Sequence, residues 1–101
     1  MIKIAITDDK MVNRKTVRAN LEDAKGISII FEASNGEEFL EKMDKLLPEQ
    51  HPQLVLMDID MPMMNGIEAI AAGTIKYPNI KFLVLTVFDD DDKIFRAIRA
   101  G

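Results

Sequence analysis

Residues 54–66 read Leu-Val-Leu-Met-Asp-Ile-Asp-Met-Pro-Met-Met-Asn-Gly. The first four residues are all apolar, a pattern typical of a parallel strand that is buried on both faces of a sheet. We therefore expect a strand that presents Asp58 at its carboxyl end. Asn65 lies at the end of the polar loop that follows, and because asparagine favours the N-cap position, a helix is predicted from there to Tyr77.

The same alternation of strand-length apolar runs and helix-length amphipathic runs covers the rest of the chain. Further strands are predicted at residues 2–6, 27–33 and 82–85. Further helices are predicted at residues 10–24, from a Ser34-x-x-Glu37 capping box to Pro48, and at residues 89–100, where residues 89–92 form an acidic first turn. The order βαβαβαβα predicts an α/β fold in which helices cover both faces of a parallel sheet.

Spacing assigns several side chains to a face. Ser28 and Glu32 interrupt the apolar strand 27–33, which suits an edge position in the sheet. Gly73 is expected to weaken its helix by about 1 kcal/mol relative to alanine. The residues predicted to face inward are Val17, Leu21 and Ala24 with the stem of Arg14 beside them, then Phe39, Leu40, Met43, Leu46 and Leu47, and then Ile67, Ile70 and Ala71.

Composition narrows the classes of function. The 101 residues carry 13 Lys+Arg and 17 Asp+Glu, a net charge of −4 that is spread evenly along the chain, so we expect no direct binding of nucleic acid. The absence of cysteine excludes disulfides, thiolate zinc sites and thiol catalysis. Because neither a signal peptide nor an apolar run of membrane length is present, one cytoplasmic domain over residues 1–101 is expected, with no membrane contact.

Polar residues follow three of the predicted strands: Asp8 and Asp9 after the first, Asp58 after the third and Thr86 after the fourth. The carboxyl ends of parallel strands meet at one edge of the sheet, where ligand sites gather. Three carboxylates at one place repel one another unless a cation lies among them. Because oxygen ligands favour a hard ion, the sequence predicts a Mg²⁺ site.

Each of these residues also has a structural interpretation. Asp8 and Asp9 can cap the helix that follows them. Asp58 can act as a nucleophile toward phosphorus and form an acyl phosphate, or it can bind amides of its own loop. Thr86 can donate a hydrogen bond to a phosphoryl oxygen, or it can be an ordinary strand end. The occurrence of three carboxylates together favours the functional interpretation.

Asp8-Asp9, the stretch 54–66 and Leu83-Val84-Leu85-Thr86 together resemble the receiver domain of two-component response regulators, over essentially the whole chain. Residues 85–101 are most similar to the NarL/FixJ branch, whose members usually carry a LuxR-type DNA-binding output domain. The resemblance implies a flavodoxin-like (CheY-like) doubly wound sheet, here of about four strands in the order 2-1-3-4 with four helices.

The resemblance also implies a role for each matching residue. Asp58 would accept a phosphoryl group from the phosphohistidine of a sensor histidine kinase. Mg²⁺ would be held by Asp9 directly, by Asp8 mainly through water, and by Asp58 and the main-chain carbonyl of Asp60. Thr86 would turn inward to meet the phosphoryl group. By this resemblance the chain would be a signalling phosphoacceptor and not an enzyme. The only reactions it would catalyse, at most, are its own phosphorylation and dephosphorylation.

The family's fifth strand, with its phosphate-binding lysine, and its fifth helix have no counterpart in these residues, and neither Lys81 nor Lys93 stands at the matching place. We therefore expect a truncated receiver without its output domain. The fourth strand, residues 81–85, would then be an exposed apolar edge, and we expect it to drive self-association as a dimer or a domain swap.

Two other functions stay open. One is a binding or structural fragment that is not phosphorylated and oligomerises through the fourth strand. The other is a phosphatase of the haloacid dehalogenase type, whose first motif resembles Asp58-x-Asp60. Against the phosphatase, residues 61–101 are too few for its remaining motifs, and it leaves Asp8 and Asp9 unexplained.

Overall fold

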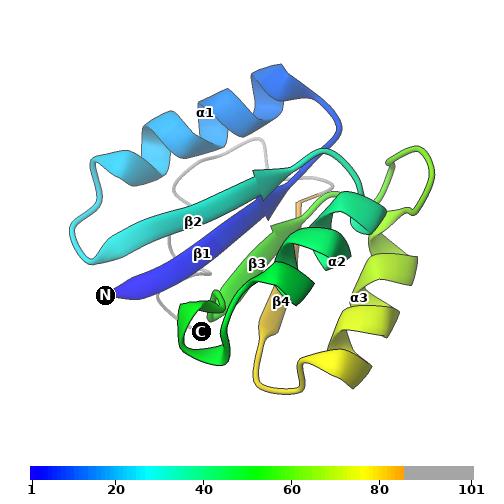
Figure 1. Cartoon of the computed structure of the whole chain (residues 1–101). Coiled ribbons are helices and arrows are strands. Elements are labelled where there is room, and N and C mark those ends of the chain that lie inside the picture. Colours follow the sequence, from blue (N-terminus) through cyan, green and yellow to red (C-terminus); the bar gives the residue numbers. More distant parts are fainter. Residues whose placement is uncertain (86–101) are drawn as a thin grey trace.

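The computed structural model describes residues 1–85. Its strands are all parallel and lie in the order β2-β1-β3-β4 (Figure 1), which confirms the predicted α/β class and the strand order 2-1-3-4. The predicted helix 89–100 lies outside the described residues. The elements are β1 (Ile2–Thr7), α1 (Met11–Glu22), β2 (Ile27–Ala33), α2 (Gly36–Lys45), the 3-10 turn η1 (Pro48–Gln50), β3 (Leu54–Met57), α3 (Gly66–Lys76) and β4 (Lys81–Val84).

The sheet separates two apolar clusters. On one face, Leu21 of α1 packs with Ile6 and Leu56 of the two central strands. On the other face, α2 and α3 cover the sheet (Figure 1), and the fully buried Phe39 packs with Val55. This division follows from the alternation of side chains along a strand, so a strand that is apolar at every position is covered on both faces. Among residues 1–85, none of the helices has the length and the apolar character needed to span a lipid bilayer.

The helix α3 approaches the sheet through small residues, which corrects its predicted inner face. Ile67 is 62% exposed and Ala71 is also exposed, while Ile70 packs against the core as predicted. Large side chains on the inner face would hold the helix away from the strands. The buried residues of α3 are Gly66, Ala69 and Gly73.

Gly73 is a packing requirement of α3. A Cβ at this position would lie 2.7 Å from Cζ of Phe82, whose ring makes an edge contact with Phe39 at 5.9 Å between centroids. The propensity cost expected for this glycine is therefore offset by the close packing that it allows.

The start of α2 differs from its prediction. The N-cap is Asn35, whose side chain accepts a hydrogen bond from the Glu38 backbone at 2.8 Å, so the predicted pairing of Ser34 with Glu37 is wrong. The Ser34 hydroxyl instead donates to the Glu38 carboxylate at 2.9 Å. Serine and asparagine are equally good N-caps, so two adjacent candidates cannot be ranked by type. The helix also ends before Leu47, which is 58% exposed and not part of the inner face.

The edge strand β2 contains a bulge. β1 pairs Ile4 with Ile29 and Ala5 with Phe31, so Ile30 has no partner. Ile29 packs on the α1 face, whereas Phe31 packs on the α2 face, although regular alternation would place both on one side. After the bulge, Glu32 pairs with arginines of α1. The edge position of β2 was predicted from this glutamate and is confirmed.

Candidate functional site

The carboxyl ends of β1 and β3 lie side by side at the centre of the sheet and carry the acidic residues. The sheet's hydrogen bonding continues past them, because the Asp58 N–H donates to Thr7 at 2.9 Å and the Asp8 N–H donates to Ala33 at 3.0 Å. One carboxylate oxygen from each of Asp8, Asp9 and Asp58 lies within 4.8 Å of the other two. The predicted convergence of these three residues is therefore confirmed as a geometry. We call them the acidic cluster.

Within residues 1–85, no arginine or lysine forms an ion pair with the acidic cluster. Asp8 is only 4% exposed, and Oδ1 of Asp9 is buried with no hydrogen-bond partner among the described residues. The pKa of Asp58 is raised, first by burial and then by the charges of Asp8 and Asp9, while backbone hydrogen bonds from Asp60 and Ile59 act in the opposite direction. A group of like charges in this state favours a bound cation.

The donor set fits Mg²⁺. All three converging ligands are carboxylate oxygens, the donor type that this ion prefers, and one of them has an unused buried oxygen. The Asp60 side chain is exposed and is not part of the cluster. Thr86, the fourth residue that the sequence assigns to this edge, lies outside the described residues.

Capping of the helix α1 explains little of the acidic cluster. Oδ1 of Asp8 accepts a hydrogen bond from the Lys10 N–H at 2.9 Å, but the N-cap of α1 is Lys10, which makes no side-chain capping bond. The interpretation of Asp8 and Asp9 as N-caps is therefore wrong, because the helix begins beyond them. It also leaves the buried oxygen of Asp9 unexplained.

Sequence reasoning missed one residue beside the cluster. The Arg14 side chain is on the inner side of α1 as predicted, and its Nη1 donates to the Asp8 carbonyl at 2.6 Å. The guanidinium also pairs with Glu32 at 3.3 Å. The signal was present as an arginine on an otherwise apolar stripe, but its target could be found only from the fold.

The loop between β3 and α3 closes tightly behind Asp58. A Cβ on Gly66 would lie 2.1 Å from the Asp58 carbonyl oxygen, so only glycine fits. In the same loop Met63 has a φ of 67° and is 76% exposed, and the Met64 carbonyl accepts a hydrogen bond from the Gly36 N–H at 3.0 Å. The loop is thereby joined to the start of α2.

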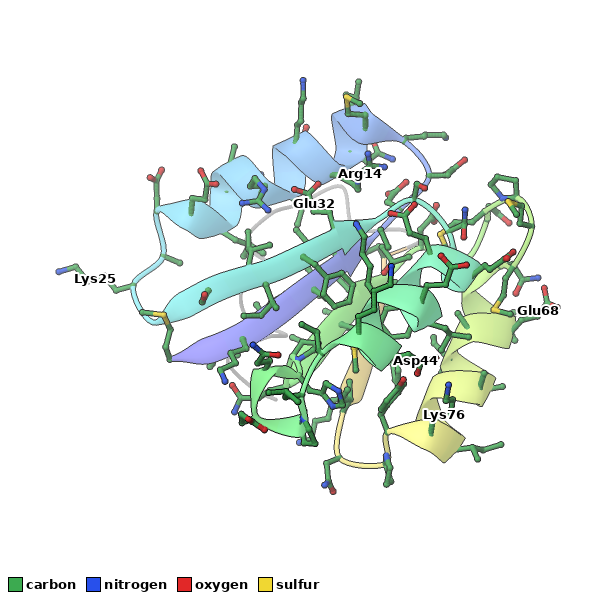
Figure 2. All side chains as sticks on the ribbon, viewed as in Figure 1. Arg14, Lys25, Glu32, Asp44, Glu68 and Lys76 are labelled. Atoms are coloured by element: carbon green, nitrogen blue, oxygen red, sulfur yellow. The ribbon has the colours of Figure 1, made fainter. Side chains whose placement is uncertain are left out.

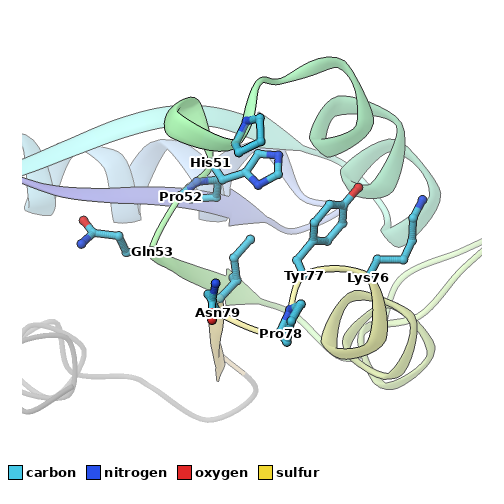
Figure 3. A pocket seen from close by; sticks show the side chains of 9 residues that line it. His51, Pro52, Gln53, Lys76, Tyr77, Pro78 and Asn79 are labelled. Atoms are coloured by element: carbon cyan, nitrogen blue, oxygen red, sulfur yellow. The ribbon is translucent and has the colours of Figure 1, made fainter.

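A pocket of ≈ 320 Å³ lies at the opposite edge of the sheet, beside the amino ends of β3 and β4 (Figure 3). The His51 and Tyr77 rings meet edge to face at 5.1 Å, and the Tyr77 hydroxyl and Lys76 both bind Asp44. Burial and then Asp44 raise the pKa of Tyr77 to about 12. None of the residues assigned to the site by sequence contributes to this pocket. Its lining residues are Pro48, His51, Pro52, Gln53, Lys76, Tyr77, Pro78, Asn79 and Ile80.

A parallel sheet in this order, with carboxylates at the ends of its central strands, is the arrangement of the CheY-like class of α/β folds. Residues 4–101 match the response regulator receiver domain, and the chain belongs to that family of two-component signalling domains.

Three comparisons give the nearer context. Transcriptional regulatory protein LnrK of Bacillus subtilis (strain 168) is 40% identical over 101 residues, which are 100% of this chain and 44% of that protein. The response regulator domain of Thermotoga maritima CheB superposes with a TM-score of 0.77 at 25% identity, covering 100% of this chain and 73% of that one. A CheY-like receiver domain of Methanospirillum hungatei JF-1 has the same fold, with a TM-score of 0.74, 24% identity, and coverage of 100% and 76%. The chain spans less than half the length of the curated relatives it matches.

Proposed function

We propose that Asp58 accepts a phosphoryl group from the phosphohistidine of a sensor histidine kinase. One observation carries the proposal: the Asp58 carboxylate, with its raised pKa, lies within 4.8 Å of two further carboxylates at the carboxyl edge of the sheet. Membership of the receiver family supports the same role. The structural alternative for Asp58, a loop aspartate that binds its own amides, accounts for the Ile59 and Asp60 hydrogen bonds but not for the other two carboxylates.

The chemistry is a transfer between two nucleophiles. A carboxylate oxygen of Asp58 forms a bond to phosphorus while the bond from phosphorus to the histidine nitrogen breaks, and the imidazole leaves with the bonding pair. The backbone hydrogen bonds from Ile59 and Asp60 orient the carboxylate before the transfer. The rigid end of β3 fixes its position.

The same residues would hold Mg²⁺. We assign direct ligation to Asp9, because its Oδ1 is buried and no other residue in the range 1–85 donates a hydrogen bond to it. We assign ligation mainly through water to Asp8, because its Oδ1 already accepts from Lys10. Asp58 and the main-chain carbonyl of Asp60 complete the protein ligands. When bound, the ion offsets the carboxylate repulsion and the charge of the phosphoryl group. Thr86 is proposed as the hydroxyl that contacts that group.

The output is proposed from the family resemblance. A phosphoryl group adds up to about −2 of charge and so biases the surrounding loops between two states. We propose that the phosphorylated receiver acts in the cytoplasm and controls transcription through a LuxR-type DNA-binding domain. In this proposal residues 1–101 make no direct contact with nucleic acid and act as a phosphoacceptor, with no turnover of an external substrate.

Intact-mass measurement after incubation with Mg²⁺ and acetyl phosphate tests the proposal. We expect one added phosphoryl group on the chain and none on Asp58→Asn or in EDTA. Asp44→Asn is the matched control, because that carboxylate is exposed and lies at the opposite edge of the sheet, outside the cluster. Equal labelling of the chain and of Asp58→Asn would overturn the assignment of the phosphoacceptor.

A phosphatase of the haloacid dehalogenase type is disfavoured. Its acid would be Asp60, whose side chain is exposed and apart from the acidic cluster, while Asp8 and Asp9 would have no role beside Asp58. Multiple turnover of a phosphomonoester would be needed to support it, whereas a receiver gives stoichiometric labelling.

Self-association is a second proposal that one observation favours. β4 is the last strand of the sheet that residues 1–85 form, and its Leu83 is only half-buried. Pairing of β4 with a second copy, or a domain swap, would satisfy such an edge. Light scattering on a sizing column tests it. A monodisperse monomer at high concentration would exclude both the dimer and the alternative of an oligomeric, non-phosphorylated fragment.

A further inference from the structure

We propose that Arg14 is a positioning residue: it fixes the backbone at Asp8 and thereby holds the acidic cluster in the geometry that binds Mg²⁺. This inference rests on the proposed function, because it concerns the same cation site. Arg14 does not contact the ion in this proposal. It acts through the main chain of Asp8.

The contacts of Asp8 carry the first step. Its N–H donates to Ala33 at 3.0 Å, its Oδ1 accepts from Lys10 at 2.9 Å, and its carbonyl accepts from Nη1 of Arg14 at 2.6 Å. The third bond is the shortest of the three, and its charged donor makes it charge-assisted. Without it, the peptide that links Asp8 to Asp9 loses the contact that sets its orientation.

The second step is that the guanidinium is itself held in place. Arg14 Nε lies 3.3 Å from Glu32, and the other oxygen of Glu32 binds Arg18 Nε at 2.6 Å. Figure 2 shows Arg14 and Glu32 meeting between α1 and β2. The Arg14 side chain is only 15% exposed, so solvent screens this pair less than a surface pair. The guanidinium therefore links the acidic loop to the edge strand.

The sign of the electrostatic effect separates positioning from charge. Arg14 is a cation near a cation site, so its charge alone opposes Mg²⁺ binding, and removing that charge would tighten binding. Removing a group that positions the ligands would weaken binding. The two explanations therefore predict opposite changes in the dissociation constant.

Arg18 provides a matched control. It lies one turn further along α1, has the same charge and shares the partner Glu32, but its other bond goes to Glu22 at 3.2 Å. Arg18→Ala thus removes a comparable ion pair and leaves the bond to the Asp8 carbonyl in place. A merely structural role for Arg14 predicts the same result for both alanine variants.

The experiment is calorimetric titration of Mg²⁺ into the full 101-residue chain and into Arg14→Ala, Arg14→Lys and Arg18→Ala, with thermal unfolding of each. We expect Arg14→Ala to weaken Mg²⁺ binding about tenfold, as for other residues that orient metal ligands. Arg18→Ala should leave the affinity unchanged at a similar loss of stability. Arg14→Lys should fall between, because one ammonium cannot span the carbonyl and Glu32 as the guanidinium does. It also keeps the comparison possible if Arg14→Ala does not fold.

A second readout needs no metal. Amide hydrogen exchange in EDTA should be faster at Asp8 and Lys10, whose N–H groups donate to Ala33 and to Asp8 Oδ1, in Arg14→Ala than in the unmodified chain, and unchanged in Arg18→Ala. Unchanged or tighter Mg²⁺ binding by Arg14→Ala, or equal weakening in both alanine variants, would overturn the inference. If the unmodified chain bound no Mg²⁺, the proposed cation site would fail, and exchange at these two amides would then decide alone whether Arg14 fixes the loop.

Discussion

The carboxyl edge of the sheet and its amino edge both gather polar side chains, but residues 1–85 satisfy those of the amino edge more fully than those of the carboxyl edge. There, Asp44 of α2 binds Lys76 at 2.8 Å (Figure 2), and it also accepts a hydrogen bond from the Tyr77 hydroxyl. At the carboxyl edge, a buried oxygen of Asp9 has no partner among the described residues, and the pKa of Asp58 is raised. The amino edge has a pocket of ≈ 320 Å³, yet the proposed site is marked by the buried, unpaired carboxylate oxygen of Asp9 and the raised pKa of Asp58 at the carboxyl edge.

The largest effect is expected from a methyl group at the carboxyl edge. Gly66→Ala should lower the free energy of unfolding by about 3 kcal/mol, because its Cβ would lie 2.1 Å from the Asp58 carbonyl. Chemical unfolding followed by circular dichroism measures it. At the amino edge, Gly26→Ala is the control: it has a φ of +88° but no atom within 4 Å, so a loss of about 1 kcal/mol is expected from the backbone alone. Equal losses would mean that the two edges are equally tight.

Asp58→Asn should stabilise the metal-free protein. Because the folded-state pKa of Asp58 is raised, protonation favours the folded state below the unfolded value of about 3.9, and that contribution is lost as the pH rises through the raised pKa. At pH 7 the substitution should therefore raise the free energy of unfolding, by about 1 kcal/mol, the usual size of a single stabilising substitution. Unfolding in EDTA as a function of pH checks this, with Asp60→Asn as control. A less stable Asp58→Asn at neutral pH would contradict it.

At the amino edge, a change at Asp44 should alter the pKa of Tyr77, which is measured from its ultraviolet absorbance. Asp44→Asn removes the second cause of the raised Tyr77 pKa but leaves burial, so the pKa should fall below about 12 and stay above the ordinary value near 10. Ultraviolet titration of tyrosinate reports this residue alone, since the chain has one tyrosine and no tryptophan. Asp58→Asn should leave the titration unchanged. A shift in that variant would show that the two edges are coupled.

The smallest effect is expected from the pocket itself. Asn79→Ala removes a lining side chain that is exposed, and we expect a change below about 0.5 kcal/mol in stability and none in Mg²⁺ affinity. Calorimetric titration and thermal unfolding measure both. A clear loss of Mg²⁺ binding in Asn79→Ala would contradict the prediction that the amino edge does not affect the cation site at the carboxyl edge.

The local sequence pattern was sufficient to predict an element where neighbouring residues alone determine it. The apolar run 54–57 identified β3 by itself, and the position of Asp58 at its end followed from parallel topology. The cap at Asn65 was found for the same reason, since its side chain accepts from Glu68 at 2.9 Å within one turn.

The missed features depend on contacts between distant elements. The inner face of α3 is set by the ring of Phe82, which leaves no room for a side chain at Gly73. The bond from Arg14 to the Asp8 carbonyl depends on where the backbone turns after β1, and its pairing with Glu32 depends on the β2 bulge. The sequence periodicity of α1 or of β2 alone predicts neither the bond from Arg14 to Asp8 nor its pairing with Glu32.

The bulge also bears on insertions and deletions. β2 uses seven residues opposite the six of β1, and the surplus one is Ile30. Deleting Ile30 would leave Ile29 and Phe31 adjacent, and strict alternation would then place each on the face it already occupies, with Glu32 still toward α1. Deletion of Ile30 is therefore expected to leave every side chain of β2 on its present face of the sheet. An inserted residue would instead need a second bulge. The edge strand thus has a length tolerance of one residue in a single direction.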